Sequence, residues 1–318
     1  MTQPEVAILI VTYNSRPEVA TCLTAALRTG ADVLVIDNAS TDGTQAAVRT
    51  LGVRLISNQR NLGFAAAVNQ GVCATTAPCL LLLNPDAVIA GGIEDLVECF
   101  RDSKTGAAGG KLLSLEGVPQ MGFNVRRFPS PLAISLECLM INRLWPRNLV
   151  NWRYRCLDLD LDKAQEVDQP AGAFLMFRRD AWQQLGGFDE GYFPIWFEDV
   201  DFCKRLRDNG FRVRYRPKAV AYHKGAHSIA QLPLGCRTEY WYRSLLRYSV
   251  QQFGFFGRLT TCVSVLTGFL LRALFIGAMP GGSEYRGPEM LRVQYAVARL
   301  AIRSLWSSKL GRGVILGA

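Results

Sequence analysis

Histidine is scarce in this chain of 318 residues, and closely paired cysteines are missing. The sequence has two His, and none of its nine Cys stands in a C-x-x-C pair. Structural zinc sites need four such ligands at short spacings, so a zinc finger or ribbon is excluded. No basic segment precedes the first apolar run at Val6, so we expect no secretion signal. The scattered cysteines then predict reduced thiols in a cytosolic protein, most of them small core residues.

Two common nucleotide-binding motifs are also absent. No G-x-G-x-x-G follows the first apolar run, and no G-x-x-x-x-G-K-[ST] occurs anywhere. These absences argue against a dinucleotide oxidoreductase and a P-loop NTPase. The composition, 49% hydrophobic and 20% charged, is that of a globular protein and excludes a disordered chain. The length allows one large α/β domain with an appendage, or two ordinary domains.

Positive charge is concentrated near the C-terminus. From Arg237 onward there are eleven Lys and Arg against three Glu, so most of the net charge of +9 lies there. A basic tail beside a neutral body predicts an anionic partner for the tail, either nucleic acid or a membrane surface. No recognised nucleic-acid motif accompanies the charge, so we expect a membrane surface and no nucleic acid.

Short apolar runs alternate with amphipathic stretches over the first hundred residues. The predicted strands are 6–11, 33–36, 53–56 and 80–83, and the predicted helices are 17–27, 44–51, 64–75 and 93–100. Continuous apolar strands separated by helices indicate parallel strands buried on both faces. The predicted fold class is therefore α/β, a Rossmann-like and mostly parallel sheet with helices on both faces.

The rest of the chain is less regular. We expect a strand at 109–113, then a long loop or mobile insert before order returns near residue 172. A strand over 172–179 then leads into a short helix, and a helix begins at Glu198 and ends at Asn209-Gly210. The last predicted strand covers 212–222 and ends at His223.

Polar residues follow all four early strands. They occupy 12–14, 37–44, 58–64 and 84–86. Turn and cap chemistry explains any one of these loops, since Asn, Asp, Ser and Gly favour strand-to-helix turns. Four successive polar ends favour a polar ligand instead, because open α/β sheets bind ligands outside the carboxyl ends of their strands.

Asp86 is the first candidate for chemistry. It follows the buried strand at 80–83, where a carboxylate suits a divalent cation that holds phosphates. Mg²⁺ and Mn²⁺ prefer oxygen ligands and often take only one or two from the protein. The alternative is that Asp86 caps the next helix.

Three acids cluster at the start of the later helix: Glu198, Asp199 and Asp201. Acidic residues are common there because they complement the helix dipole. The bulky segment 193–197 before them forms an apolar wall, which raises a carboxylate pKa and favours a general base. His223 has two readings that stay open, a hydrogen-bonded structural residue or a functional one.

The motifs, taken in order, resemble the family 2 glycosyltransferases over roughly residues 5–230. They are Ile10-Val11-Thr12-Tyr13-Asn14, Val35-Ile36-Asp37-Asn38-Ala39-Ser40-Thr41-Asp42-Gly43, Asn61-Leu62-Gly63-Phe64-Ala65, Leu83-Asn84-Pro85-Asp86, Gly172-Ala173-Phe174, Gly186-Gly187-Phe188-Asp189-Glu190, Phe197-Glu198-Asp199-Val200-Asp201 and His223. The Asn-Pro-Asp and Glu-Asp-Val-Asp forms look most like bacterial rhamnosyltransferases of cell-wall and O-antigen assembly.

That resemblance implies a GT-A fold, an inverting mechanism, a nucleotide-sugar donor and Mg²⁺ or Mn²⁺. The implied nucleotide-sugar-binding residues are Thr12, Tyr13, Asn14, Asp37, Asn38, Asp42, Asn61, Gly63, Phe64, Asn84, Asp86, Gly172 and Ala173. Asp86 and His223 would hold the metal, and Asp199 with Glu198 would be catalytic. Asn84 stands where many relatives carry the first Asp of D-x-D, so we expect weak metal affinity.

The reaction expected from this resemblance is transfer of a sugar, most of all L-rhamnose from dTDP-L-rhamnose, to a lipid-linked or polysaccharide acceptor. Another sugar donor and a non-catalytic nucleotide-sugar-binding scaffold are the alternatives. A processive synthase is disfavoured, because the chain has no Q-x-x-R-W motif.

The basic tail holds two apolar segments. Thirteen uncharged residues span 259–271, which is short for a membrane span of about 20 residues. We expect an in-plane helix or hairpin there, and a second amphipathic helix around Arg292, Arg299 and Arg303. The alternative is a soluble helical cap or a homodimer interface. The expected domains are 1–235 for the glycosyltransferase and 236–318 for the tail, peripheral on the inner face of the cell membrane.

Overall fold

The computed structural model describes residues 5–225, 232–275 and 288–308. The chain divides into two compact units. The first unit comprises Met1–Phe128, Arg155–Asp189 and Glu198–Ser228, and the second comprises Pro129–Tyr154, Glu190–Phe197 and Ile229–Ala318. In this division 129–154 and 190–197 group with the C-terminal helices.

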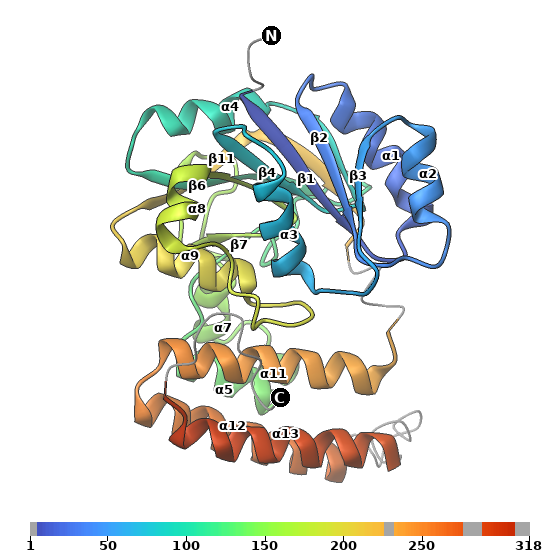
Figure 1. Cartoon of the computed structure of the whole chain (residues 1–318). Helices are drawn as coiled ribbons and strands as arrows, with labels where there is room; N and C mark the ends of the chain where they lie inside the picture. Colours follow the sequence, from blue (N-terminus) through green and yellow to red (C-terminus); the bar gives the residue numbers. More distant parts are fainter. Residues whose placement is uncertain (1–4, 226–231, 276–287, 309–318) are drawn as a thin grey trace. The chain divides into compact units, whose positions relative to one another are not determined.

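A nine-stranded mixed sheet forms the first unit (Figure 1). Its order is β3-β2-β1-β4-β10-β6-β11-β5, and β8 pairs with β11. The strands are β1 Val6–Thr12, β2 Asp32–Asp37, β3 Arg54–Ser57, β4 Cys79–Leu83, β5 Ala87–Gly91, β6 Thr105–Leu113, β8 Gln165–Glu166, β10 Phe174–Arg178 and β11 Arg212–His223. A separate ladder joins β7 (Val125–Arg126) to β9 (Gln169–Pro170). The four early strands are confirmed as parallel neighbours, whereas β5 was not predicted.

Helices cover both faces of this sheet, which confirms the predicted fold class. Alternate side chains of β1 enter two different cores: Ile8 packs with helices α1, α2 and α4, and Leu9 packs with α3, α8 and α9. These helices are α1 Arg16–Leu27, α2 Thr44–Thr50, α3 Phe64–Cys73, α4 Ile93–Glu98, α8 Arg179–Leu185 and α9 Glu198–Asp208, with a short 3₁₀ helix at Cys99–Arg101.

The cysteines behave as the sequence predicts. All nine are free thiols, and six of them are buried: Cys22, Cys79, Cys138, Cys156, Cys203 and Cys262. Burial raises the pKa of Cys79 to about 11, so this thiol stays protonated at neutral pH.

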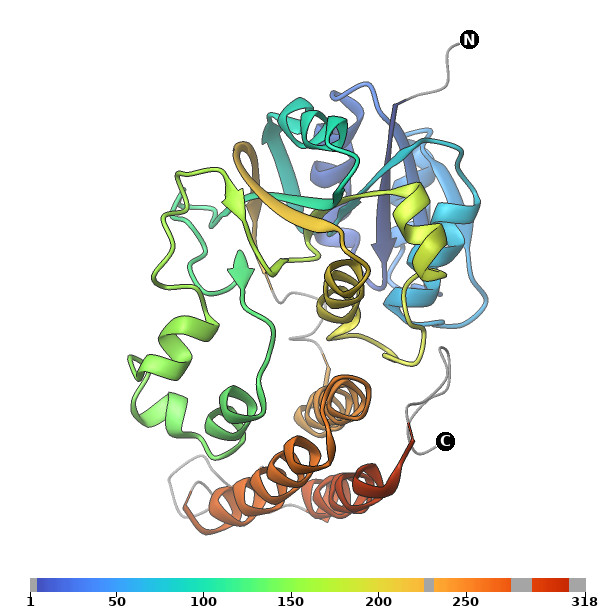
Figure 2. The ribbon, with the colours of Figure 1, turned by 90° about the vertical axis from the view of Figure 1, so that its left-hand side faces the viewer.

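The second unit is helical. Its elements are α5 Pro131–Cys138, α6 Ile141–Leu144, α7 Leu149–Tyr154, α11 Leu234–Gln252, α12 Phe255–Phe275 and α13 Pro288–Trp306. The expected long loop across the middle of the chain is therefore wrong, because α5, α6 and α7 form there. α13 packs against α11 and α12, the orange and red helices of Figure 2, and α5 packs against α12.

Helix α12 is longer than the uncharged segment inside it. The helix runs through Arg258 and Arg272, and Phe255–Arg272 is long and apolar enough to cross a bilayer. Length and composition alone support that statement, and a core helix of a soluble protein meets the same criteria; 33% of the stretch is buried. The helix is thus longer than the thirteen uncharged residues of 259–271, and the in-plane arrangement of this segment stays a prediction.

Small residues in β6 allow close packing at the centre of the sheet. A Cβ added at Gly110 would lie 2.3 Å from Cε1 of Phe174 and 2.6 Å from the carbonyl oxygen of Ala219. Since one of these atoms belongs to the backbone, the neighbours cannot all move aside. Gly110 is thus required by its surroundings rather than by an unusual φ.

We expect Gly110→Ala to lower the free energy of unfolding by about 1–3 kcal/mol, because the added methyl overpacks the core. Gly254→Ala is the control: no heavy atom lies within 4 Å of its added Cβ, and we expect a change below about 0.5 kcal/mol. Urea unfolding of both variants measures the difference. Equal stability of the two variants would contradict this packing argument.

Candidate nucleotide-sugar and acid-base site

Asp37 organises the loops that follow β1 and β2. Its buried carboxylate accepts hydrogen bonds from Thr12 Oγ1 at 2.8 Å, Ser40 Oγ at 2.5 Å, Ser40 N at 2.9 Å and Gln45 Nε2 at 2.7 Å. Asn14, with φ +51°, joins the same network by donating its N–H to Ser40 Oγ at 2.8 Å. A buried carboxylate with this many donors fixes the shape of both loops.

Asn38 performs the corresponding task for the loop before α3. It is buried; its Nδ2 donates to the Gly63 carbonyl at 3.2 Å, and its Oδ1 accepts from Asn58 Nδ2 at 2.9 Å. Asn61 Oδ1 accepts from Gly63 N at 2.8 Å, where φ is +85°. The structure therefore brings the polar ends of β1, β2 and β3 together.

Three other predicted residues surround this network. Asp42 accepts from Arg16 N at 3.0 Å and Thr44 N at 3.0 Å; although burial opposes the effect, these hydrogen bonds and one from the Thr44 hydroxyl lower the pKa of Asp42. Tyr13 is 37% exposed. Phe64 is the first residue of α3 and packs partly against the core that contains Leu9.

Asp86 and His223 meet at the ends of adjacent elements. Asp86 Oδ1 lies 3.4 Å from His223 Nε2, and Asp86 Oδ2 accepts from Gly225 N at 3.0 Å. Burial favours the neutral acid, but His223 and the Gly225 amide outweigh it and lower the pKa of Asp86. Asn84 Nδ2 lies 3.4 Å from the same His223 nitrogen.

Gln120 holds the other side of the imidazole. Its Nε2 donates to the His223 carbonyl at 2.6 Å, which leaves its Oε1 facing His223 Nδ1 at 3.0 Å. This arrangement requires a proton on Nδ1 and, in the neutral ring, a lone pair on Nε2. Phe123 stacks on the ring at 5.2 Å. His223 is thus oriented with Nε2 toward Asp86.

The Asp86–His223 pair fits a divalent cation as a two-ligand site. Among the residues that the structure describes, no group of three or more His, Cys, Asp or Glu is close enough to hold a metal. Two protein ligands are enough for Mg²⁺ or Mn²⁺ when substrate phosphates complete the shell. The Gln120 contact also supplies the outer hydrogen bond that metal-binding histidines require.

Asp199 is held by the segment before β10. Its Oδ2 accepts from Gly172 N at 2.9 Å and from Gln169 Nε2 at 3.1 Å. Burial nevertheless outweighs these bonds and raises the pKa of Asp199. A Cβ at Gly172 would lie 3.0 Å from Asp199 Oδ2, so any larger residue would push against the Asp199 side chain.

The neighbouring residue connects this acid to the metal candidate. The Ala173 carbonyl accepts from Asn84 N at 3.0 Å, two residues before Asp86. The amide of Gly172 therefore holds Asp199, and the carbonyl of the next residue, Ala173, holds the turn that carries Asp86.

The Glu198 carboxyl group is buried in an environment that disfavours its charged form. It is 5% exposed, and its Oε2 has no hydrogen-bond partner among the described residues. Burial first, and then the neighbouring Asp199 carboxylate, raise the pKa of Glu198 well above its ordinary value. Asp201, by contrast, pairs with Arg205 at 2.7 Å and stabilises α9.

The sequence analysis missed several residues of the site. Ser40 lies inside one of the matched motifs, but no role was assigned to it. The other omissions are Gln45, Gln120, Gln169 and Gly225, which are single residues outside every motif. Only the tertiary structure identifies them.

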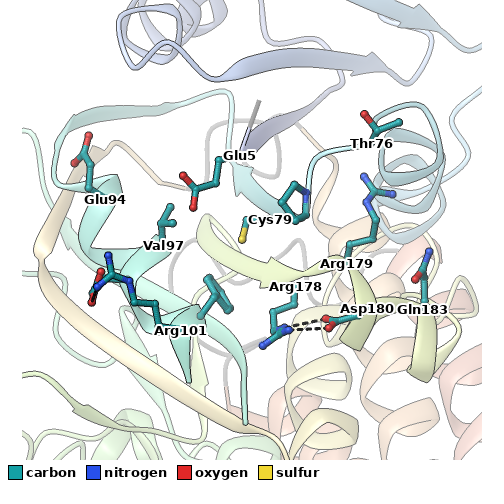
Figure 3. A pocket seen from close by; sticks show the side chains of 13 residues that line it. Glu5, Thr76, Cys79, Glu94, Val97, Arg101, Arg178, Arg179, Asp180 and Gln183 are labelled. Atoms are coloured by element: carbon teal, nitrogen blue, oxygen red, sulfur yellow. Dashed lines mark hydrogen bonds and ion pairs between the residues drawn. The ribbon is translucent and has the colours of Figure 1, made fainter. Parts of the chain in front are cut away.

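A cavity of about 660 Å³ lies at the opposite edge of the sheet (Figure 3). Its wall includes Cys79, where β4 begins, and Arg178, where the antiparallel β10 ends. The Arg178 guanidinium pairs with Asp180 at 2.8 Å. None of the predicted site residues lines this cavity.

The fold agrees with comparisons to known protein families. Residues 7–186 match the model for glycosyl transferase family 2, and residues 159–228 match that for the N-terminal domain of galactosyltransferase. The chain belongs to glycosyl transferase family 2 and is a glycosyltransferase.

Two relatives to which the chain is similar in sequence are rhamnosyltransferases. The chain is 31% identical over 276 residues to an N-acetylglucosaminyl-diphospho-decaprenol L-rhamnosyltransferase of Mycobacterium tuberculosis, covering 77% of this chain and 88% of the relative. It is 41% identical over 61 residues to rhamnosyltransferase WbbL of Escherichia coli, covering 19% of this chain and 23% of that protein.

Solved structures support the GT-A architecture. Mannosyltransferase PcManGT from Pyrobaculum calidifontis, in complex with GDP-Man and Mn²⁺, has a TM-score of 0.55 at 17% identity, covering 96% of this chain and 88% of that one. GalNAc-T7 with UDP, GalNAc and Mn²⁺ has a TM-score of 0.59 at 14% identity, covering 95% and 56%. At these identities the likeness concerns the fold alone.

We expect Glu198→Gln to stabilise the protein by about 1 kcal/mol at pH 7–8. A raised folded-state pKa means that the native state disfavours the ionised acid. The wild type therefore loses stability as pH rises from the unfolded pKa, and the amide does not. The gain should vanish below about pH 4, where the unfolded acid is also neutral.

Denaturant unfolding across this pH range measures the effect. Glu94→Gln, at an exposed position of α4, is the matched control, with an expected change below about 0.5 kcal/mol at every pH. A loss of stability in Glu198→Gln at pH 7 would refute the unpaired-acid assignment.

Proposed function

We propose that this enzyme transfers L-rhamnose from dTDP-L-rhamnose, with inversion, to a polyprenyl-diphosphate-linked acceptor in cell-envelope glycan assembly. The observation that carries this proposal is the 31% identity across 88% of a relative whose name specifies that sugar and a diphospho-decaprenol acceptor. The site supplies the two groups that the chemistry needs, an acid suited to hold a cation and an acid suited to act as a base.

The loops after the first three strands would bind the nucleoside. Buried Thr12, Asp37 and Asn38 have their polar groups engaged within the protein, so they shape the pocket. Asn14 and Asn61, with Tyr13, would lie on its surface. The backbone at Gly63 and the start of α2, where Asp42 accepts from the Thr44 amide, would complete the donor site.

Asp86 and His223 would hold Mg²⁺ or Mn²⁺, with Asn84 beside them. When bound, the cation neutralises charge on the departing nucleoside diphosphate. Asp86 supplies the negative oxygen ligand, while Gln120 keeps the His223 Nε2 lone pair directed to the same place. The GDP-Man and UDP complexes of the two structural neighbours contain Mn²⁺, which supports this assignment.

Asp199 would remove the proton from the acceptor hydroxyl. An inverting transfer needs one base on the face opposite the leaving group and no carboxylate nucleophile. Its raised pKa makes it a stronger base than an ordinary aspartate. Glu198, held largely neutral beside it, would limit the negative charge near Asp199, and Gly172 with Ala173 would leave space for the sugar.

The helical C-terminal region, 236–318 in our domain assignment, would lie on the inner face of the cell membrane. Exposed apolar side chains of α12 recur on one stripe: Phe256, Leu259, Val263, Leu270 and Leu274. Such a stripe beside basic residues is typical of an interfacial helix. A homodimer that covers the same stripe is the alternative.

We expect Asp199→Asn to lower kcat by about 10²–10⁴-fold, because the general base is lost. In the wild type, kcat/KM should fall as pH drops through the raised pKa of Asp199, and the variant should lack that limb. Asp32→Asn, which breaks a surface ion pair with Arg54, is the control with unchanged kcat. Full activity in Asp199→Asn would reject the base assignment.

The donor assignment is tested by thermal shift and slow donor hydrolysis with a panel of nucleotide sugars, with and without Mn²⁺ and Mg²⁺. We expect a metal-dependent shift with dTDP-L-rhamnose and its loss in Asp86→Asn. Preference for a UDP- or GDP-sugar would replace rhamnose by another donor. Binding of a nucleotide sugar without any turnover would favour the scaffold alternative, and no binding of any donor would reject the donor site.

A further inference from the structure

A second cavity lies wholly within the helical unit. It has a volume of about 380 Å³ and is formed by α5, α11, α12 and α13 together with Trp196. Ligand-binding pockets typically measure about 300–1,000 Å³. Trp196 and Trp241 contribute aromatic walls, and Trp196 adopts φ +80°, which is rare for a bulky residue.

Four polar atoms that line this cavity have no hydrogen-bond partner of good geometry in the described part of the chain, although the Arg272 guanidinium lies beside Tyr242. They are Arg237 Nε, Tyr242 Oη, Arg272 Nη1 and Gln294 Nε2, and each of these atoms is buried. Tyr242 as a whole is only 3% exposed. Buried polar groups are almost always paired in folded proteins, so four unpaired groups around one cavity indicate a missing partner.

The chemistry of these groups defines that partner. Three of the four atoms can only donate, and burial raises the pKa of Tyr242, which keeps its hydroxyl proton. The one carboxylate in the wall, Glu137, already accepts from Asn142 Nδ2 at 2.8 Å. Two guanidiniums facing one carboxylate leave a net positive cavity, and guanidinium pairs best with phosphate or carboxylate.

The surroundings favour an anion with an apolar chain. Phe269 lines the cavity beside the tryptophans, and the volume exceeds what a phosphate group alone would fill. The same helices expose apolar side chains, among them Leu270 on α12 and Leu291 on α13. A free inorganic anion has no apolar part that could pack against these side chains.

We propose that this cavity binds the diphosphate head of a lipid, with Arg237, Tyr242, Arg272 and Gln294 as donors and the aromatic walls against the first part of its chain. The inference rests on the proposed function for the identity of the lipid as the acceptor carrier. The binding chemistry itself follows from the cavity.

The test is calorimetric titration of the full chain with farnesyl diphosphate in EDTA. We expect Arg272→Gln to weaken binding at least about tenfold, because a charge-assisted hydrogen bond is lost. Tyr242→Phe, which removes only the hydroxyl, should weaken it about threefold. Arg292→Gln, an exposed arginine of α13, should change it less than about twofold. Thermal unfolding confirms that each variant is folded.

Inorganic pyrophosphate and Asp86→Asn distinguish the sources of binding. We expect pyrophosphate to bind at least about tenfold more weakly than farnesyl diphosphate, since it lacks the apolar chain. Equal affinity for the two would overturn the lipid assignment. Loss of binding in Asp86→Asn would place the diphosphate in the donor site. Equal losses in Arg272→Gln and Arg292→Gln would show that the overall positive charge of the protein explains the binding. Either result refutes the proposal that the cavity binds the diphosphate.

The two proposals fail separately. Unchanged farnesyl diphosphate binding in Arg272→Gln and Tyr242→Phe, with rhamnosyl transfer intact, refutes only the cavity. Absence of nucleotide-sugar turnover, with arginine-dependent farnesyl diphosphate binding intact, refutes only the proposed function.

Discussion

The antiparallel pairing of β10 with β4 is the constraint on which the site depends. It aligns Phe174 with Leu83, so the residues just before β10 lie beside those just after β4. One carbonyl, from Ala173, then fixes the Asn84 turn, and one amide, from Gly172, fixes Asp199. Because backbone groups at successive residues make both contacts, a shift of register would displace both acids together.

The two acids are held in opposite electrostatic conditions. Asp86 accepts a hydrogen bond from a backbone amide, which favours its charged form, and His223 Nε2 faces the same carboxylate, so the pair suits a cation. Asp199 receives two hydrogen bonds, but its burial outweighs them and disfavours its charged form. Pairs of carboxyl groups whose pKa values move apart indicate different chemical roles. The unpartnered Glu198 oxygen shows that the fold accepts a loss of stability here.

The sequence predicts the parallel half of the sheet well because local patterns determine it. Each early strand is a continuous apolar run, and each carries its polar residues at the ligand edge. The loops at Asp37 and Asn38 could be located for the same reason. Their partners could not: Gln120 and Gln169 reach the site through contacts across 103 and 30 positions of the chain. No local pattern carries that information.

The prediction of a long loop in the middle of the chain was wrong for a related reason. Helices α5, α6 and α7 are short, and tertiary packing rather than propensity stabilises such helices. α5 packs against α6 and α7, and also against α12, far along the chain, where Ser264 Oγ donates to Ser135 Oγ at 2.9 Å. α11 has a mixed polar and aromatic sequence, and the sequence predicted a helical C-terminal region without giving the bounds of this helix. Its inward face became recognisable only with Tyr242 and Tyr248 buried.

The two proposed sites would present opposite kinds of surface to phosphate groups. At Asp86 the protein presents a carboxylate, which repels a diphosphate unless a cation lies between them. In the helical cavity the protein presents guanidinium, amide and hydroxyl donors, which need no cation. A departing diphosphate gains from a Lewis acid because negative charge develops on it as the bond breaks. A diphosphate that only anchors a substrate develops no such charge, so fixed donors suffice. The contrast between the carboxylate site and the donor-lined cavity would suit a glycosyltransferase that cleaves one phosphate linkage and leaves the other intact.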